Sequence, residues 1–93
     1  MDKDTQSYFV KNNWDFIENN TKVKKIFKFK TFKEAFSWMT EIALSAEKLD
    51  HHPDWTNIYN RVIVILSTHD VGKITKKDIL LARFMDEIVD RYN

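Results

Sequence analysis

Residues 61–67 constrain the fold of this chain more than any other segment, because they are apolar on both faces of an extended strand. Alternate side chains of a strand point in opposite directions, so the run VIVIL at residues 62–66 places two valines and a leucine on one face and two isoleucines on the other. Strands of this kind are typical of the interior of a covered sheet. We therefore expect a central strand, with helices on one face and another subunit or a ligand on the other.

Two earlier segments alternate in the same way and predict a β-hairpin. Trp14 and Phe16 alternate with polar residues, and after the polar stretch 18–21 Phe27 and Phe29 alternate with lysines. A strand pattern resumes at Trp55 and leads into the central strand.

The apolar period changes to that of a helix at residue 32. Thr31 and Glu34 have the spacing of a capping box, which begins a helix at Phe32. Pro53 lacks a backbone donor and disfavours helical angles in the preceding residue, so this helix should end near Leu49. Six apolar residues share one face of the helix: Phe32, Ala35, Phe36, Met39, Ala43 and Ala46.

Three further apolar residues, Trp38, Ile42 and Leu49, widen this stripe along one flank. The extra width suits a contact with another subunit and a broad core face about equally.

A second helix is expected at the end of the chain. Thr75 and Asp78 cap it after a turn at Gly72, and its apolar face is formed by Leu81, Phe84, Met85, Ile88 and Tyr92. The order ββαββα makes residues 1–93 a single α+β domain, with a four-stranded antiparallel sheet and helices packed on one face.

Charge and composition exclude several classes of function. Fifteen Lys and Arg against 14 Asp and Glu give a formal net charge of +1, so no strong overall field attracts nucleic acid or an anionic membrane. The chain has no cysteine, which excludes disulfides, thiolate metal ligands and a cysteine nucleophile. No apolar run approaches the roughly 18 residues of a membrane span, and the first ten residues lack the pattern of a signal peptide. We expect a cytoplasmic protein.

A lysine-rich strip follows the second predicted strand and comprises Lys22, Lys24, Lys25, Lys28 and Lys30. Lysines alternating with Phe27 and Phe29 are typical of the solvated face of a strand. A site for nucleic acid would combine arginines with exposed aromatic residues, so direct binding of nucleic acid is not expected.

The three histidines fall in two loops that are candidates for acid–base chemistry. His51 and His52 follow the first predicted helix, and His69 follows the central strand. Imidazole titrates near neutral pH, which suits proton transfer, although histidines in loops are often only solvated. Adjacent residues of an extended segment point to opposite sides, so His51 and His52 are poorly placed to hold one metal ion, and we predict no metal site.

The three histidines, together with four neighbouring positions, have a spacing that resembles the signature of the pterin-4a-carbinolamine dehydratases. The matching positions are Glu47, His51, His52, Pro53, Tyr59, His69 and Asp78, and the segments AEKLDHHPDW and NIYNRVIVILSTHD also resemble the family. The similarity covers residues 14–88. It implies dehydration of 4a-hydroxytetrahydropterin to quinonoid dihydropterin, in recycling of the tetrahydrobiopterin cofactor, without a metal or an organic cofactor.

The resemblance also implies roles for individual residues. His51, His52 and His69 would be catalytic with Glu47 in support, and the pterin would be bound by His51, His52, Pro53, Thr68, His69, Asp70 and Val71. We expect His52 and His69 to transfer protons and His51 to hold the pterin ring and its hydroxyl group. Asp78 matches the last signature position, although its role as a helix cap could explain it.

Two departures from the family and one alternative function follow from the same comparison. Family members usually have a helix before the first strand, which we expect to be curtailed or absent here, and the turn after the last histidine has one glycine, Gly72, where two are common. The family also includes dimerisation cofactors of transcription factors, so an interaction protein that uses the flank of Trp38 is the main alternative; a non-catalytic pterin binder is another. Self-association as a dimer or tetramer is expected.

Overall fold

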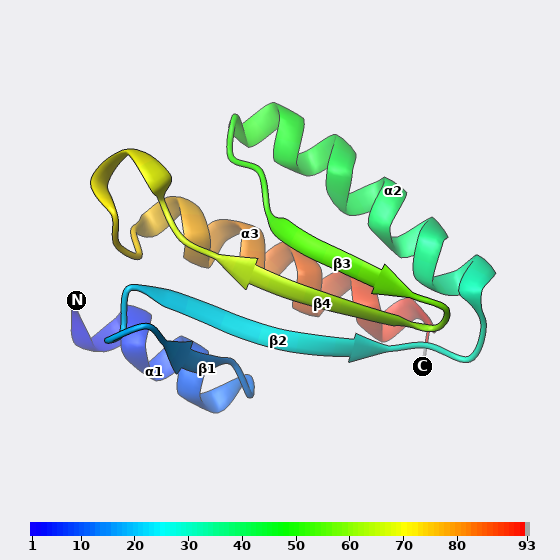
Figure 1. Cartoon of the computed structure of the whole chain (residues 1–93), viewed down its shortest axis with the longest axis horizontal. Helices are drawn as coiled ribbons and strands as arrows, with labels where there is room; N and C mark the ends of the chain where they lie inside the picture. The colour runs from blue at the N-terminus through cyan, green and yellow to red at the C-terminus, as the bar shows by residue number, and fades with distance from the viewer. Residues whose placement is uncertain (93) are drawn as a thin grey trace.

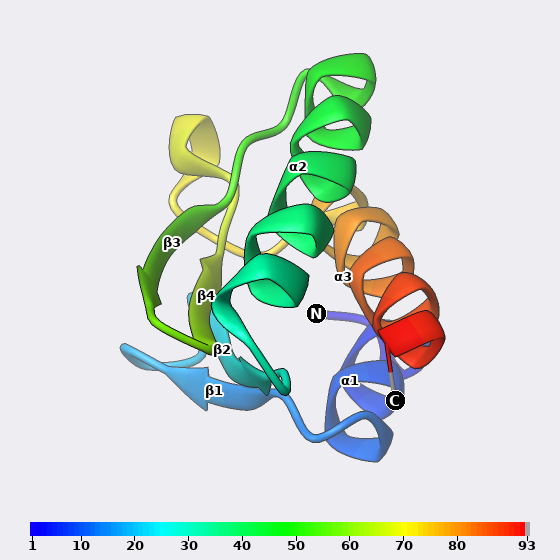
Figure 2. The ribbon, with the colours of Figure 1, turned by 90° about the vertical axis from the view of Figure 1, so that its right-hand side faces the viewer.

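A computed structural model describes residues 1–92 of the chain as two layers, an antiparallel sheet and three α-helices that cover one of its faces (Figures 1 and 2). The strands are β1 (Asp15–Ile17), β2 (Lys22–Lys28), β3 (Asp54–Ile58) and β4 (Arg61–Leu66), arranged in the sheet as β1-β2-β4-β3. The helices are α1 (Lys3–Lys11), α2 (Phe32–Leu49) and α3 (Lys76–Val89), and short 3-10 turns η1 (His69–Val71) and η2 (Asp90–Tyr92) follow β4 and α3. The predicted α+β class with four antiparallel strands is confirmed.

Strand β4 is central, as predicted, and pairs with β2 on one side and β3 on the other. Its residues Val62, Val64 and Leu66 are buried beneath the helices. Ile63 and Ile65 alternate with these residues and are half-buried. No helix of the described residues covers the opposite face of the sheet (Figure 2).

The chain begins with a nine-residue helix that the predicted order ββαββα left out, so the order is αββαββα. Asp2 caps α1 by accepting a hydrogen bond from the Thr5 backbone nitrogen at 2.7 Å. Phe9 is fully buried against Trp14 and Phe16 in edge-to-face contacts. Phe9 is the only apolar side chain of α1 that is buried, and one such residue is too sparse a pattern to predict a helix from periodicity.

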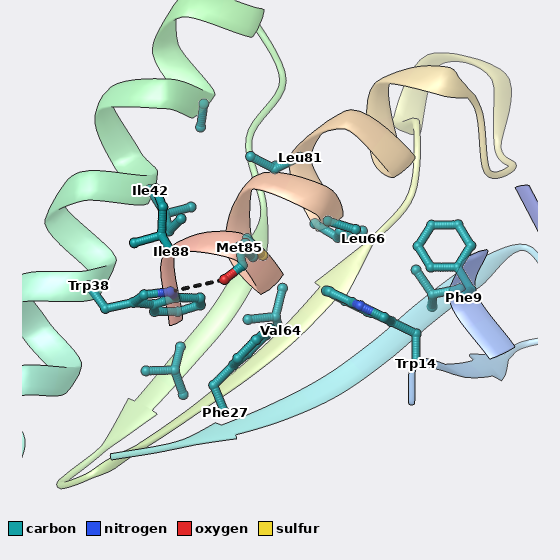
Figure 3. Packing of buried hydrophobic residues seen from close by; sticks show 14 of the residues in the cluster. Phe9, Trp14, Phe27, Trp38, Ile42, Val64, Leu66, Leu81, Met85 and Ile88 are labelled. Carbon is teal, nitrogen blue, oxygen red and sulfur yellow. Dashed lines mark hydrogen bonds between the residues drawn. The ribbon is translucent and has the colours of Figure 1, made fainter. Parts of the chain in front are cut away.

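Helix α2 begins and ends where the sequence predicts, but its buried face is different. Thr31 caps it by accepting from the Glu34 backbone nitrogen. Trp38 and Ile42 belong to the flank that suited a subunit contact and a broad core face about equally; they are 0% exposed and lie at the centre of the core (Figure 3). The indole nitrogen of Trp38 donates to the Met85 carbonyl oxygen at 3.3 Å, which ties α2 to α3 (Figure 3).

Phe32 and Phe36, expected on the core face of α2, are instead about half exposed and contact each other. Apolar residues occupy so much of this helix that periodicity alone does not define the centre of the buried stripe. The large indole of Trp38 fills the space over the sheet, and this turns Phe32 and Phe36 outward.

Lys25 is an exception to the prediction that the lysines of β2 form a solvated face. It lies on the inner side of the strand between Val23 and Phe27, and its ammonium group contacts Asp86 of α3 at 2.6 Å. The same carboxylate accepts from the Tyr8 hydroxyl at 2.6 Å and the Trp14 indole nitrogen at 3.0 Å. Burial and this bond to a carboxylate raise the pKa of Tyr8 well above its ordinary value of 10.0. Asp86 therefore joins α1, β2 and α3.

We expect Asp86→Asn to lower the free energy of unfolding by about 2 kcal/mol, because the half-buried Lys25 loses its counter-ion. Glu87→Gln is the matched control: Glu87 is exposed on the same helix, and its replacement should change stability by less than about 0.5 kcal/mol. Urea denaturation measures both. Equal unfolding midpoints for the two variants would contradict a stabilising role for Asp86.

Candidate active site

A pocket of about 260 Å³ is lined by residues from the end of α2, the exit of β4 and the start of α3. These three segments lie at the same end of the molecule (Figure 1). The pocket is lined by Asp50, His51, His52, Ser67, Thr68, His69, Asp70 and Lys77. Other hollows on the surface are as large, but this one gathers all three histidines of the chain. Its volume lies just below the roughly 300–1,000 Å³ typical of small-molecule sites.

The end of α2 fixes the position of His51. Asp50 adopts a left-handed conformation with φ 52°, and the backbone nitrogens of Asp50 and His51 donate to the carbonyl oxygens of Glu47 and Ala46, each at 3.1 Å. This closes the last turn of the helix with hydrogen bonds that would otherwise be missing. The backbone that leads into His51 is therefore held by hydrogen bonds to the last turn of α2.

The side chain of His51 points into the protein and pairs with Asp78. His51 is 8% exposed, and its Nε2 lies 2.6 Å from Asp78 Oδ1. Asp78 is 0% exposed, and its other oxygen accepts from the Thr75 backbone nitrogen and the Thr68 hydroxyl, each at 2.9 Å. Asp78 is thus both the predicted helix cap and the partner of a histidine 27 residues away.

His52 points the other way and pairs with a different carboxylate. Its Nε2 lies 2.6 Å from Glu47 Oε1, with 58% of the histidine side chain and 77% of the glutamate side chain exposed. An exposed pair of this kind adds little to stability, although it orients the imidazole ring. The two adjacent histidines therefore have different surroundings, one buried and one in solvent.

His69 is carried by the turn η1 that follows β4. The Thr68 carbonyl oxygen accepts from the backbone nitrogens of Val71 and Gly72, and Gly72 is left-handed with φ 63°. The imidazole of His69 is exposed and forms no side-chain hydrogen bond within residues 1–92. It is thus free to contact a molecule in the pocket.

Five of the seven residues expected to bind substrate line the pocket, namely His51, His52, Thr68, His69 and Asp70. Pro53 and Val71 are not among its lining residues, and Tyr59 of the signature lies in the β3–β4 turn, at the far end of those strands. Asp50, Ser67 and Lys77 also line the pocket and were not predicted as site residues. Each is a direct neighbour of a predicted residue, so adjacency to His51, Thr68 and Asp78 is the signal that could have identified them.

Within residues 1–92, no group of three or more His, Asp or Glu side chains is arranged to hold a metal ion. Across that same part of the chain, every helix is too short or too polar to span a membrane. Three imidazoles therefore line the pocket, and two of them are hydrogen-bonded to carboxylates behind them. Groups of this kind can transfer protons near neutral pH.

These features define a small α+β protein with a histidine-lined pocket, and comparison with known sequences gives its family. Residues 1–88 match the family model described as pterin 4 alpha carbinolamine dehydratase, and the chain belongs to that family. A protein of Prochlorococcus marinus (strain NATL2A), named provisionally as such a dehydratase, is 47% identical over 90 residues, which are 97% of this chain and 95% of the relative. A protein of Jannaschia sp. (strain CCS1) with the same provisional name is 47% identical over 75 residues, covering 81% and 76% of the two chains.

Solved structures agree with the fold. The crystal structure of a transcriptional coactivator/pterin dehydratase from Brucella melitensis has a TM-score of 0.86 and 40% identity, covering 96% of this chain and 97% of that one. A pterin dehydratase-like protein described as a RuBisCO assembly factor in the alpha-carboxysome has a TM-score of 0.70, covering 82% and 88% of the two chains. Its identity of 16% makes it a likeness of fold alone.

We expect Asp78→Ala to lower the free energy of unfolding by about 3 kcal/mol, because His51, the Thr68 hydroxyl and the Thr75 amide would lose a buried acceptor. Asp70→Ala is the control, since Asp70 is an exposed aspartate of the same pocket. Thermal or urea unfolding followed by circular dichroism measures both. If the two variants lost equal stability, Asp78 would not be the buried support of the site.

Proposed function

We propose that this protein dehydrates 4a-hydroxytetrahydropterin to quinonoid dihydropterin, as the name of its family describes. The observation that carries the proposal is the meeting of His51, His52 and His69 in one pocket, where the chain's three imidazoles converge from two separate loops. Each of the three matches a histidine of the family signature. Cofactor recycling in the cytoplasm and self-association belong to the same proposal.

The reaction needs proton transfer and no redox partner. The bond between C4a and the hydroxyl oxygen breaks, and the oxygen leaves as water after it gains a proton. The proton on N5 passes to a base, and the N5 electrons form the C4a=N5 double bond. One acid and one base therefore suffice, and each positioned group contributes about 100-fold or more to the rate.

The surroundings of the three histidines suggest how they divide this work. His52 and His69 are exposed to the pocket and are suited to exchange protons with N5 and the leaving hydroxyl. Glu47 orients the ring of His52. His51 is held by Asp78 and is suited to position the hydroxyl group of the substrate.

An interaction protein remains the second candidate, and one observation favours it. Phe32, Phe36 and Leu44 on the outer side of α2 are about half exposed or more, although the flank of Trp38 first considered for a partner is buried. The Brucella melitensis protein is described both as a transcriptional coactivator and as a pterin dehydratase. Such a role would not depend on the histidines, so loss of turnover on histidine substitution separates the two functions.

We expect the wild-type protein to accelerate the decay of freshly generated 4a-hydroxytetrahydropterin, followed by ultraviolet absorbance. His69→Ala should lower kcat by about 100-fold or more, because an exposed proton-transfer group is removed without loss of a hydrogen bond in the fold. Lys28→Ala is the control, since Lys28 is exposed at the end of β2 farthest from the pocket. It should retain wild-type turnover.

The same assay can contradict the proposal in two ways. Absence of acceleration by folded wild-type protein would exclude the dehydratase. Near-normal turnover by His69→Ala would leave the activity in place but exclude proton transfer by His69. A protein that binds pterin without accelerating the decay would be the non-catalytic binder.

A further inference from the structure

The side-chain hydroxyl of Thr68 faces the interior of the site rather than the substrate pocket. It lies 2.9 Å from Asp78 Oδ2 and 2.5 Å from the Thr75 hydroxyl. Thr68 is also the residue directly before His69, and its backbone begins the turn η1. Thr68 therefore contacts Asp78, the partner of His51, and directly precedes His69 in the chain.

The direction of these hydrogen bonds can be assigned from the partners. An ionised carboxylate only accepts, so the Thr68 hydroxyl donates to Asp78 Oδ2. The Thr75 hydroxyl must then donate to Thr68, and its oxygen accepts from the Lys77 backbone nitrogen at 3.3 Å. The chain of donors from Lys77 through Thr75 and Thr68 ends on Asp78.

The surroundings of Asp78 also indicate where the proton of His51 lies. Asp78 Oδ2 accepts two hydrogen bonds at the N-terminus of α3, which favours an ionised carboxylate, so Nε2 of His51 donates to Asp78 Oδ1. Nδ1 of a neutral His51 then carries no proton and is an acceptor. Nδ1 forms no hydrogen bond within residues 1–92, and no buried side-chain nitrogen or oxygen there lacks a partner, so Nδ1 is accessible to solvent. His51 also lines the pocket.

We propose that Thr68 is a positioning residue whose hydroxyl holds the Asp78 carboxylate so that His51 presents an unprotonated Nδ1 to the 4a-hydroxyl group of the substrate. The inference rests on the proposed function for the identity of that hydroxyl group. Nδ1 accepts its hydrogen bond, which turns the oxygen lone pairs toward the proton donor. Thr68 acts through Asp78 and His51 and does not itself touch the reacting atoms.

The tautomer of His51 tests the first half of this inference on the wild-type protein. Long-range ¹H–¹⁵N correlation spectra distinguish protonated Nε2 from protonated Nδ1, and comparison with His51→Gln assigns the signals. We expect the proton on Nε2 at a pH where the ring is neutral. A proton on Nδ1 would overturn the inference, whether or not the protein is a dehydratase.

Substitution of Thr68 tests the second half. Thr68→Val keeps the shape of the side chain and removes the hydroxyl, so kcat should fall about tenfold with less than a twofold change in KM, and a second His51 tautomer should appear in the spectrum. Thr68→Ser keeps the hydroxyl and should restore kcat to within about twofold of wild type. Thr56→Val is the control, since Thr56 is exposed on the far face of β3 and has no side-chain hydrogen bond among the described residues.

Each outcome decides between positioning and a general structural role. Wild-type kcat in folded Thr68→Val would overturn the inference, as would equal losses of kcat in Thr68→Val and Thr68→Ser. If Thr68→Val does not fold, Thr68→Ala and Thr68→Ser provide the same comparison. An inactive wild-type protein with the expected tautomer would refute the dehydratase while leaving the role of Thr68 toward His51 intact.

Discussion

The carboxylate of Asp78 is a charge removed completely from water, and the arrangement of the site follows from the need to satisfy it. An unpaired buried charge costs several kcal/mol, so donors from different parts of the chain must meet there. His51 comes from the end of α2, Thr68 from the exit of β4 and Thr75 from the start of α3. Satisfying one carboxylate therefore places the histidine loops beside each other before any substrate binds.

Helix α3 carries a second, largely buried carboxylate two turns further on. Asp86 accepts from Lys25, Tyr8 and Trp14, as Asp78 accepts from the residues of the pocket. Between them lies an apolar contact surface that includes Leu81 and Met85, both fully buried. Helix α3 thus contacts the sheet and the other helices through apolar packing at its centre and through a carboxylate toward each end.

Local patterns in the sequence predicted the helices and strands other than α1. The ion pairs and the buried face of α2 depend on contacts between distant residues, and local patterns did not predict them. The two-faced strand β4 and the caps Thr31 and Thr75 depend on neighbours within a few residues, and each was predicted. The pairs Lys25–Asp86 and His51–Asp78 join residues 61 and 27 positions apart, and neither residue of a pair specifies the other locally. The buried face of α2 was misjudged for the same reason, because only the opposing surface distinguishes Trp38 from its apolar neighbours. The sequence suggested that the three histidines share one site, but only the folded structure shows that they line one pocket.

The two adjacent histidines also limit how the loop after α2 can vary in length. Most surface loops accept insertions, since a longer loop costs little entropy. Here one peptide bond separates a ring in the interior from a ring in solvent. An added or deleted residue between Asp50 and Pro53 would exchange the two environments while leaving the composition of the loop almost unchanged. The number of residues in the connection between α2 and β3, as well as their chemical character, therefore determines which histidine is buried.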